Sequence, residues 1–315
     1  ILFSSFSITA QKILITNLEV DKLNSPHGLD NKNPKFSWII DTDHYNVLQT
    51  HYQVFVATDK VFSKNSLVWD SGKVASEESV YVNYLGKELA YDTQYFWTVK
   101  VWTNKSKRSS QSKVSSWKTG LMDKQNWKSN WITVNNEDMT SPKIPYFIND
   151  FRVDSKIISA NLYITSRGVY EAHINGKRIG DAILTPGWTS YSNRIQYQAY
   201  DVMEMLLTGE NRIGVMLADG WYRNFRQNRK NRIVDYGERT SFISELIISY
   251  EDGRKESIID EKNWSYNYGP ILSSSIYNGE TVDMNLKNSK WSFPGHKNKN
   301  SKKPKSASRY KVFID

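Results

Sequence analysis

Apolar and polar residues alternate with a period of two along much of the 315-residue chain, and helical periodicity is scarce. Tyr95, Trp97, Val99 and Val101, for example, fall on one face of a run, as a half-buried strand requires. Clusters of Gly, Asn, Asp and Ser separate such runs and are typical of turns. The pattern therefore predicts an all-β protein.

The first block of alternating residues spans positions 13–120. About seven short strands are expected there, which favours a β-sandwich of the immunoglobulin or fibronectin type III kind. Tyr95 stands just before the inward-facing Trp97 on a late strand of this block. That is the place of a tyrosine corner, in which a tyrosine hydroxyl bonds the backbone a few residues upstream.

The rest of the chain predicts a linker, a second sandwich and a tail. Residues 121–143 are polar and Asn-rich, and we expect an ordered linker there. Residues 144–291 are again strand-rich and contain the hairpin signal Asn175-Gly176, which fits a jelly-roll sandwich. Residues 292–315 are rich in Lys, Asn and Ser without a core pattern, which predicts a disordered basic tail.

The net charge of +9 belongs almost entirely to the end of the chain. Residues 287–315 hold nine Lys or Arg and one acid, whereas the remainder holds 33 basic and 32 acidic side chains. A nucleic-acid surface would need the charge spread over a folded face, so no nucleic-acid partner is expected. The sequence has no Cys for disulfides or thiolate sites, and no run approaches the roughly 20 apolar residues of a membrane span.

Residues 1–12 suggest export. The segment is apolar and small and has Ala10 before Gln11, like the second half of a secretory signal with its cleavage position. We therefore interpret residues 1–12 as a signal-peptide remnant of a secreted or periplasmic bacterial protein. The alternative is a frayed N-terminal strand.

Candidate chemistry gathers in three loop segments, residues 184–191, 218–225 and 275–283. Each places aromatic rings beside polar groups at a Gly turn; rings stack on the apolar face of a sugar, while Asp, Asn and Glu accept from its hydroxyls. The alternative is that Trp188 and Trp221 plug the end of the sandwich. The candidate carbohydrate-binding residues are Trp188, Tyr191, Asp219, Trp221, Tyr222, Asn224 and Glu280.

Other chemistry has less support. The five His residues are scattered without metal-ligand spacing, so no metal site is predicted. A glycosidase needs two carboxylates roughly 5–9.5 Å apart, and no complete catalytic pair is expected in this chain. Residues 223–232 carry five cations, which form either a solvated loop or an Arg contact for carboxylates and sulfates of an acidic polysaccharide.

The chain resembles the N-terminal part of bacterial α-L-rhamnosidases of glycoside hydrolase family 78. The resemblance covers residues 13–290 and rests on a series of short phrases in a fixed order. These phrases are Asn33-Pro-Lys-Phe-Ser-Trp38, Gln49-Thr-His-Tyr-Gln-Val54, Val68-Trp-Asp-Ser-Gly-Lys73, Trp117-Lys-Thr-Gly-Leu121, Asn175-Gly-Lys-Arg-Ile-Gly-Asp181, Pro186-Gly-Trp188 with Tyr191, Tyr197-Gln-Ala-Tyr-Asp-Val202, Asp219-Gly-Trp-Tyr222, Gly269-Pro270 and Tyr277-Asn-Gly-Glu-Thr-Val-Asp283.

The resemblance implies a fibronectin-like domain and a galactose-binding-like jelly roll that precede a catalytic (α/α)₆ barrel lying outside these residues. It implies a non-catalytic accessory role, either binding rhamnose-containing glycan or packing on the barrel, and it allows calcium, although no ligands can be matched. The alternatives are a stand-alone lectin-like protein and an active α-L-rhamnosidase. Two departures, Met284-Asn285 in place of Ala-Arg and the Lys/Asn/Ser tail, suggest a truncated, frame-shifted or split gene product.

Overall fold

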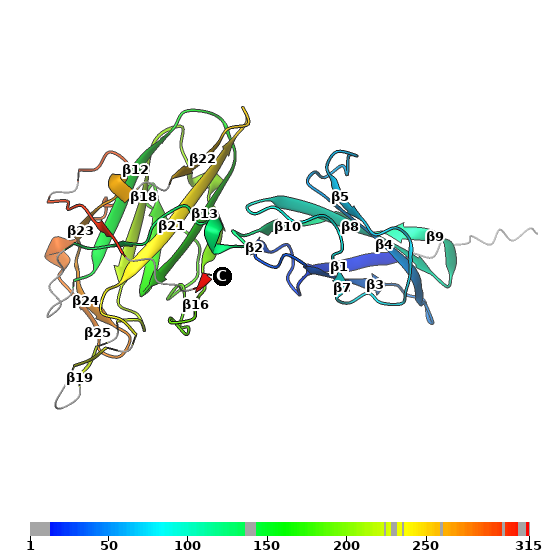
Figure 1. Ribbon diagram of the computed structural model, residues 1–315, viewed down its shortest axis with the longest axis horizontal. Helices are drawn as coiled ribbons and strands as arrows, with labels where there is room; N and C mark the ends of the chain where they lie inside the picture. Colours follow the sequence, from blue (N-terminus) through cyan, green and yellow to red (C-terminus); the bar gives the residue numbers. More distant parts are fainter. Residues whose placement is uncertain are drawn as a thin grey trace, which may run out of the picture. The chain divides into compact units, whose positions relative to one another are not determined.

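The computed structural model describes residues 13–135, 143–223, 225–227, 232–234, 236–258, 261–297, 300–307 and 313–314. The chain divides into two compact units, with the boundary between Met122 and Asp123. Both units are built from strands (Figure 1), so the predicted all-β class is confirmed. The signal-peptide interpretation of residues 1–12 and the candidate Asn224 lie outside the described residues.

The first unit is a sandwich of two sheets. One sheet has the order β1-β3-β7, and the other has the order β2-β10-β8-β4-β5, with β6 beside β4 and β9 beside β8. The strands are β1 (Leu14–Val20), β2 (His27–Leu29), β3 (Lys35–Asp41), β4 (Gln49–Ala57), β5 (Leu67–Asp70), β6 (Val74–Ala75), β7 (Val82–Asn83), β8 (Gln94–Thr103), β9 (Ser106–Gln111) and β10 (Ser115–Thr119).

Aromatic side chains fill the core of this first sandwich. Phe36 lies 4.6 Å from Trp97 and 5.5 Å from Trp117, measured between ring centroids. The expected inward face of β8 is confirmed, because Tyr95, Trp97, Val99 and Val101 are all buried. The hydroxyl of Tyr95 accepts the backbone N–H of Ala90 at 2.8 Å, which is the bond that a tyrosine corner requires.

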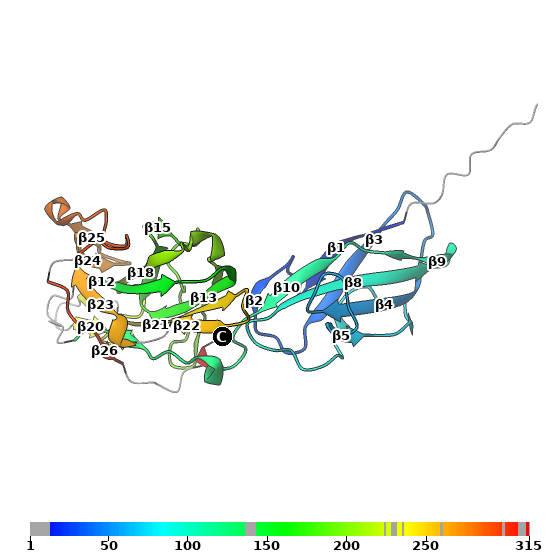
Figure 2. The same cartoon turned by 90° about the horizontal axis from the view of Figure 1, so that it is seen from above.

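The second unit encloses its core between two larger sheets, which Figure 2 shows as successive layers. The six-stranded sheet has the order β17-β13-β21-β11-β26 with β22 beside β21, and the five-stranded sheet has the order β15-β14-β18-β12-β23. Its elements are η1 (Lys124–Asn126), β11 (Ile132–Thr133), β12 (Pro145–Val153), β13 (Ile157–Arg167), β14 (Val169–Ile174), β15 (Lys177–Arg178), β16 (Arg194–Ile195), β17 (Gln198–Asp201), η2 (Met203–Met205), β18 (Gly209–Ala218), β19 (Phe225–Gln227), β20 (Arg232–Val234), β21 (Ser241–Tyr250), β22 (Lys255–Ile258), η3 (Glu261–Asn263), β23 (Ser265–Tyr268), β24 (Ile271–Ser275), β25 (Gly279–Val282), η4 (Met284–Leu286), β26 (Lys305–Ser306) and β27 (Phe313–Ile314).

The Asn175-Gly176 hairpin forms as its sequence predicts. It joins β14 to β15, and both residues have positive φ, 51° and 83°. Such a turn needs φ above zero at both central residues, which Asn and Gly accept at little cost.

The predicted linker is not a separate element in its described part. Strand β11 pairs with β21 on one side and with β26 on the other, so it lies inside the six-stranded sheet. Trp127 and Trp131 are buried as well. The polar composition of residues 121–143 predicts a linker, but the buried Trp127 and Trp131 and the two-residue strand β11 attach its described part to the second unit.

The predicted disorder of the tail is also wrong for its described residues. Lys302 exchanges backbone hydrogen bonds with Tyr266, and Lys305 in β26 pairs with Thr133. Upstream, the carbonyl of Ser292 accepts the N–H of Gly176 at 3.0 Å. Backbone pairing at an edge strand needs no apolar side chain, so a Lys-rich segment joins the sheet without showing a core pattern in its sequence.

Candidate functional site

Trp188 is the most prominent of the predicted carbohydrate-binding residues. Its side chain is 65% exposed, yet its indole N–H donates to the hydroxyl of Tyr236 at 2.9 Å. The ring is thus held in place while most of its surface faces solvent. A large aromatic side chain in this state supplies apolar contact area at a low entropic cost on binding.

Three tyrosines form a cluster next to Trp188. The ring centroid of Tyr191 lies 5.1 Å from that of Tyr222 and 5.0 Å from that of Tyr236. The N–H groups of Tyr236 and Gly237 both donate to the carbonyl of Tyr222 at 3.1 Å. A side chain at position 237 would collide with the Tyr222 ring, because an added Cβ would lie 2.3 Å from its hydroxyl oxygen.

Tyr191 supports the cluster from inside. The residue is buried, and its hydroxyl donates to the carbonyl of Gly187 at 3.2 Å. Burial raises the pKa of Tyr191 well above its ordinary value, and the neighbouring Tyr236 and Tyr222 raise it further. Its hydroxyl is therefore a neutral hydrogen-bonding group at physiological pH.

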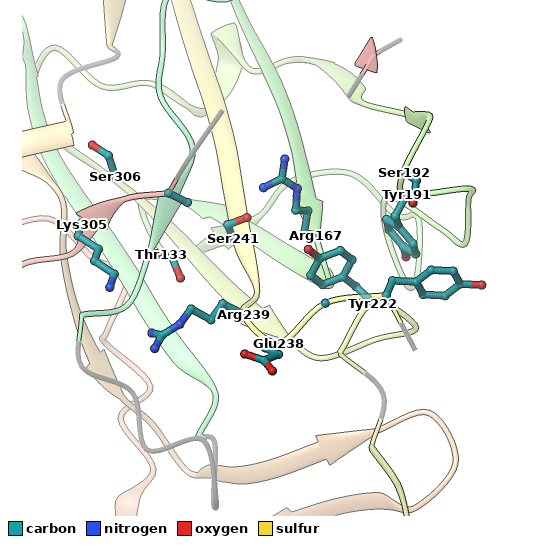
Figure 3. A pocket seen from close by; sticks show the side chains of 13 residues that line it. Thr133, Arg167, Tyr191, Ser192, Tyr222, Glu238, Arg239, Ser241, Lys305 and Ser306 are labelled. Atoms are coloured by element: carbon teal, nitrogen blue, oxygen red, sulfur yellow. The ribbon is translucent and has the colours of Figure 1, made fainter. Parts of the chain in front are cut away.

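The tyrosine cluster borders a cavity of about 830 Å³ (Figure 3). This volume lies within the usual range of small-ligand sites. Figure 3 shows Tyr191 and Tyr222 on one side, Lys305 and Ser306 on the other, and Arg167 and Ser241 between them. The lining residues are Thr133, Arg167, Tyr191, Ser192, Tyr222, Tyr236, Gly237, Glu238, Arg239, Ser241, Lys305, Ser306 and Ala307.

Asp219 is buried, whereas a residue that accepts hydrogen bonds from sugar hydroxyls is expected at the surface. Its carboxylate is buried and forms an ion pair with Arg223, with Nε and Nη2 lying 2.8 Å and 2.6 Å from Oδ1. Arg223 is itself fully buried, so the idea that the cations of residues 223–232 are all solvated is wrong for this side chain. The pair fixes the turn that carries the half-buried Trp221 and Tyr222.

Glu280 lies apart from this cavity in the part of the chain that the structure describes. It is exposed on β25, in the β24–β25 hairpin, and accepts a hydrogen bond from Ser274 Oγ at 3.3 Å. The structure thus brings Tyr191 and Tyr222 together at the cavity and links Trp188 to it through Tyr236. Sequence analysis missed Arg167, Ser241, Thr133 and Lys305, because only strand pairing brings them together. It also missed Tyr236, which lies in the loop before β21 and reaches the cavity through its bond to the carbonyl of Tyr222.

Glu245 lies on β21 in the six-stranded sheet and carries a testable pH dependence. Its buried carboxylate accepts the backbone N–H of Lys128 at 2.7 Å. Burial raises the pKa of Glu245 above its usual 4.5, and the hydrogen bonds it accepts only partly offset this. The folded protein therefore holds this proton more tightly than the unfolded chain, so stability falls as pH rises from about 4.5 through the raised pKa.

We expect Glu245→Gln to remove this pH-dependent loss. Thermal unfolding of the two proteins from pH 4 to pH 8 checks the expectation, because each unit of pKa difference corresponds to about 1.4 kcal/mol. The midpoint of the native protein should fall relative to that of the Gln variant above pH 4.5. Parallel curves across the range would contradict this account.

A family model named "Alpha-L-rhamnosidase N-terminal domain" matches residues 155–312 of the chain. The chain belongs to this family. A second model, named "Rha78A-like, N-terminal immunoglobulin domain", matches residues 15–123, which confirms the immunoglobulin-like sandwich of the first unit. The resemblance to family 78 rhamnosidases is thus confirmed, and the rhamnosidase model extends through most of the basic tail, in agreement with the pairing of β26.

Relatives of this family align with nearly the whole chain. An "Alpha-L-rhamnosidase" of Formosa agariphila is 31% identical over 91% of the chain, which covers 33% of that protein. The solved α-L-rhamnosidase of Dictyoglumus thermophilum is 34% identical with a TM-score of 0.87, over 96% of the chain and 35% of the relative. That of Aspergillus terreus is 27% identical with a TM-score of 0.84, again over 96% and 35%. The chain therefore spans about a third of the length of these relatives.

The described part of this rhamnosidase N-terminal region gives no support for a calcium site. Within it, no group of three His, Asp or Glu side chains lies close enough to hold a metal ion. No ligand set for calcium can be assigned on this basis. Among the described residues there is also no helix with the length and apolar character needed to cross a membrane.

Proposed function

We propose that this chain is the non-catalytic accessory portion of a secreted or periplasmic α-L-rhamnosidase, and that its second unit holds rhamnose-containing glycan for a catalytic domain elsewhere in the protein. The relatives are named α-L-rhamnosidases, and the chain matches only about a third of their length. The jelly-roll nature of the second sandwich is part of this proposal. Export rests on the signal-like residues 1–12.

The observation that carries the glycan-binding role is the exposed but anchored ring of Trp188. It is 65% exposed, bonded to Tyr236, and placed beside a cavity with a tyrosine wall. A ring that only plugged the sandwich end would be buried. Sugar recognition uses this combination of an apolar ring face and nearby polar groups.

We expect Trp188→Ala to weaken glycan binding at least tenfold without changing stability. A single rhamnose unit should bind near the millimolar range, or about 4 kcal/mol, so a rhamnose-rich oligosaccharide is the better titrant in calorimetry. Tyr45→Ala, at a 91% exposed aromatic residue of the first unit, is the control and should bind normally. Equal affinity of the native protein and Trp188→Ala would remove Trp188 from the site.

A second candidate function is packing on the catalytic domain. A set of exposed apolar side chains follows the β24–β25 hairpin and the segment after it: Tyr277, Val282, Met284, Leu286 and Phe293. A large exposed apolar patch on a folded protein commonly marks a surface that another protein or domain covers. If packing on the catalytic domain is the only role, the chain will bind no glycan in the titration. Turnover of an aryl α-L-rhamnoside by the chain alone would favour the third alternative, an active hydrolase.

A further inference from the structure

A row of polar side chains crosses four neighbouring strands on the outer face of the six-stranded sheet. Arg167 of β13 lies opposite Ser241 of β21. The register of β11 against β21 places Thr133 beside Ser241, and Lys305 of β26 lies opposite Thr133. Residues opposite one another in adjacent strands project to the same side, so all four side chains face one surface. All four also line the 830 Å³ cavity.

Two of the three buried members of this row, Arg167 and Thr133, hold fixed positions. Arg167 is 3% exposed, and its guanidinium carbon lies 4.3 Å from the ring centroid of Trp131. Such stacking orients an arginine fork and lowers the entropy lost when it binds an oxyanion. Thr133 donates its hydroxyl to the carbonyl of Thr240 at 2.7 Å, which fixes the neighbouring part of the wall.

The buried hydroxyl of Ser241 points to a ligand. Ser241 is 1% exposed, and its Oγ has no hydrogen-bond partner among the described residues. A buried hydroxyl left without a partner costs about 1–3 kcal/mol. In the wall of a cavity, a ligand oxygen is the natural acceptor for this group.

The charge of the cavity specifies the kind of ligand. Its described lining holds three cations, Arg167, Arg239 and Lys305, against the one carboxylate of Glu238. Arg239, Lys305 and Glu238 are exposed, so their side chains are free to adjust around a ligand. An arginine fork with added cations favours a carboxylate or a sulfate over a neutral group.

We propose that this cavity binds an acidic sugar unit of the glycan. Its oxyanion pairs with Arg167, Arg239 and Lys305, the Ser241 hydroxyl donates to it, and the sugar ring contacts Tyr222. This inference rests on the proposed glycan-binding function and adds a negatively charged unit to the ligand. A uronic acid carboxylate and a sulfate ester present the same chemistry, and the experiment separates them.

The test uses calorimetric titration of the full chain with four oligosaccharides of equal length. They carry glucuronic acid, the same unit with its carboxyl reduced, sulfated rhamnose, or neutral rhamnose only. We expect at least one acidic probe to bind tenfold or more tightly than its neutral counterpart, with an affinity that falls as salt rises. The tighter of the two acidic probes identifies the source of the oxyanion.

Three cavity variants and one control connect this preference with the cavity. Arg239→Met and Ser241→Ala should each reduce the preference for the acidic probe fivefold or more. Ser241→Ala should not lower the unfolding midpoint, because none of the described residues bonds its hydroxyl. Glu238→Gln should strengthen acidic binding. Lys156→Met removes one cation from an exposed ion pair that does not line the cavity, and it should change nothing.

Each outcome decides a different claim. Equal binding of acidic and neutral probes, or an acidic preference that Arg239→Met and Ser241→Ala leave unchanged, overturns the acidic-sugar site while the glycan-binding function stands. Failure of all four probes to bind overturns both the site and the proposed glycan-binding function.

Discussion

Replacing Arg223 by methionine is expected to reduce the free energy of unfolding of the second unit by about 3–5 kcal/mol. The side chains of Arg223 and Asp219 are 0% and 6% exposed, and the shorter of their contacts is 2.6 Å. Removal of the cation would leave the Asp219 carboxylate buried without its opposite charge. Breaking a buried pair in this way costs far more than the pair itself contributes to stability.

Differential scanning calorimetry of the full chain measures this effect, and the transition of the first unit provides an internal reference. The double variant Asp219→Asn/Arg223→Met should recover part of the loss, because no unpaired charge then remains. Lys156→Met is the matched control, since it breaks the exposed pair with Glu251, whose side chains are 72% and 61% exposed, and should leave the midpoint unchanged. A loss below about 1 kcal/mol for Arg223→Met would show that water reaches the pair.

The strands of both sandwiches were predictable because their signals are local. Alternation identified the inward face of β8 with Trp97, and the Asn175-Gly176 dipeptide identified the β14–β15 turn. The tail and the linker were misjudged for the opposite reason. β11 and β26 are held by backbone bonds to strands far away in the sequence, and neither has a hydrophobic repeat that reveals them.

The candidate site shows the same division between local and distant information. Aromatic residues beside Gly turns predict Trp188, Tyr191 and Tyr222 as carbohydrate-binding residues, and the structure places the two tyrosines at the cavity. The pairing of Arg167 with Ser241 depends on the register of β13 against β21, which no short sequence window contains. Likewise, the spacing of Asp219 and Arg223 is visible in the sequence, but their burial is not.

Gly168→Ala is expected to lower the free energy of unfolding of the second unit by at least about 3 kcal/mol, an effect comparable to that of Arg223→Met. Gly168 joins β13 to β14 with φ of +125°, a conformation that costs a residue with a side chain about 1–3 kcal/mol. In addition, an added Cβ would lie 2.3 Å from the carbonyl oxygen of Ala218. That contact involves backbone rather than a flexible side chain, so the strands themselves must shift.

Gly253→Ala separates the contribution of the clash from that of the backbone conformation. Gly253 also has a positive φ, +86°, but an added Cβ would have nothing within 4 Å, so we expect a loss of only about 1–2 kcal/mol. Gly168 adjoins Arg167, and Ala218 adjoins Asp219, so a shift at their contact moves both the polar row and the buried ion pair. Gly168→Ala should therefore weaken glycan binding as well as lower the unfolding midpoint, whereas Gly253→Ala should bind normally. Equal losses of stability in the two variants would mean that the Gly168 turn and β18 move apart without cost at this contact.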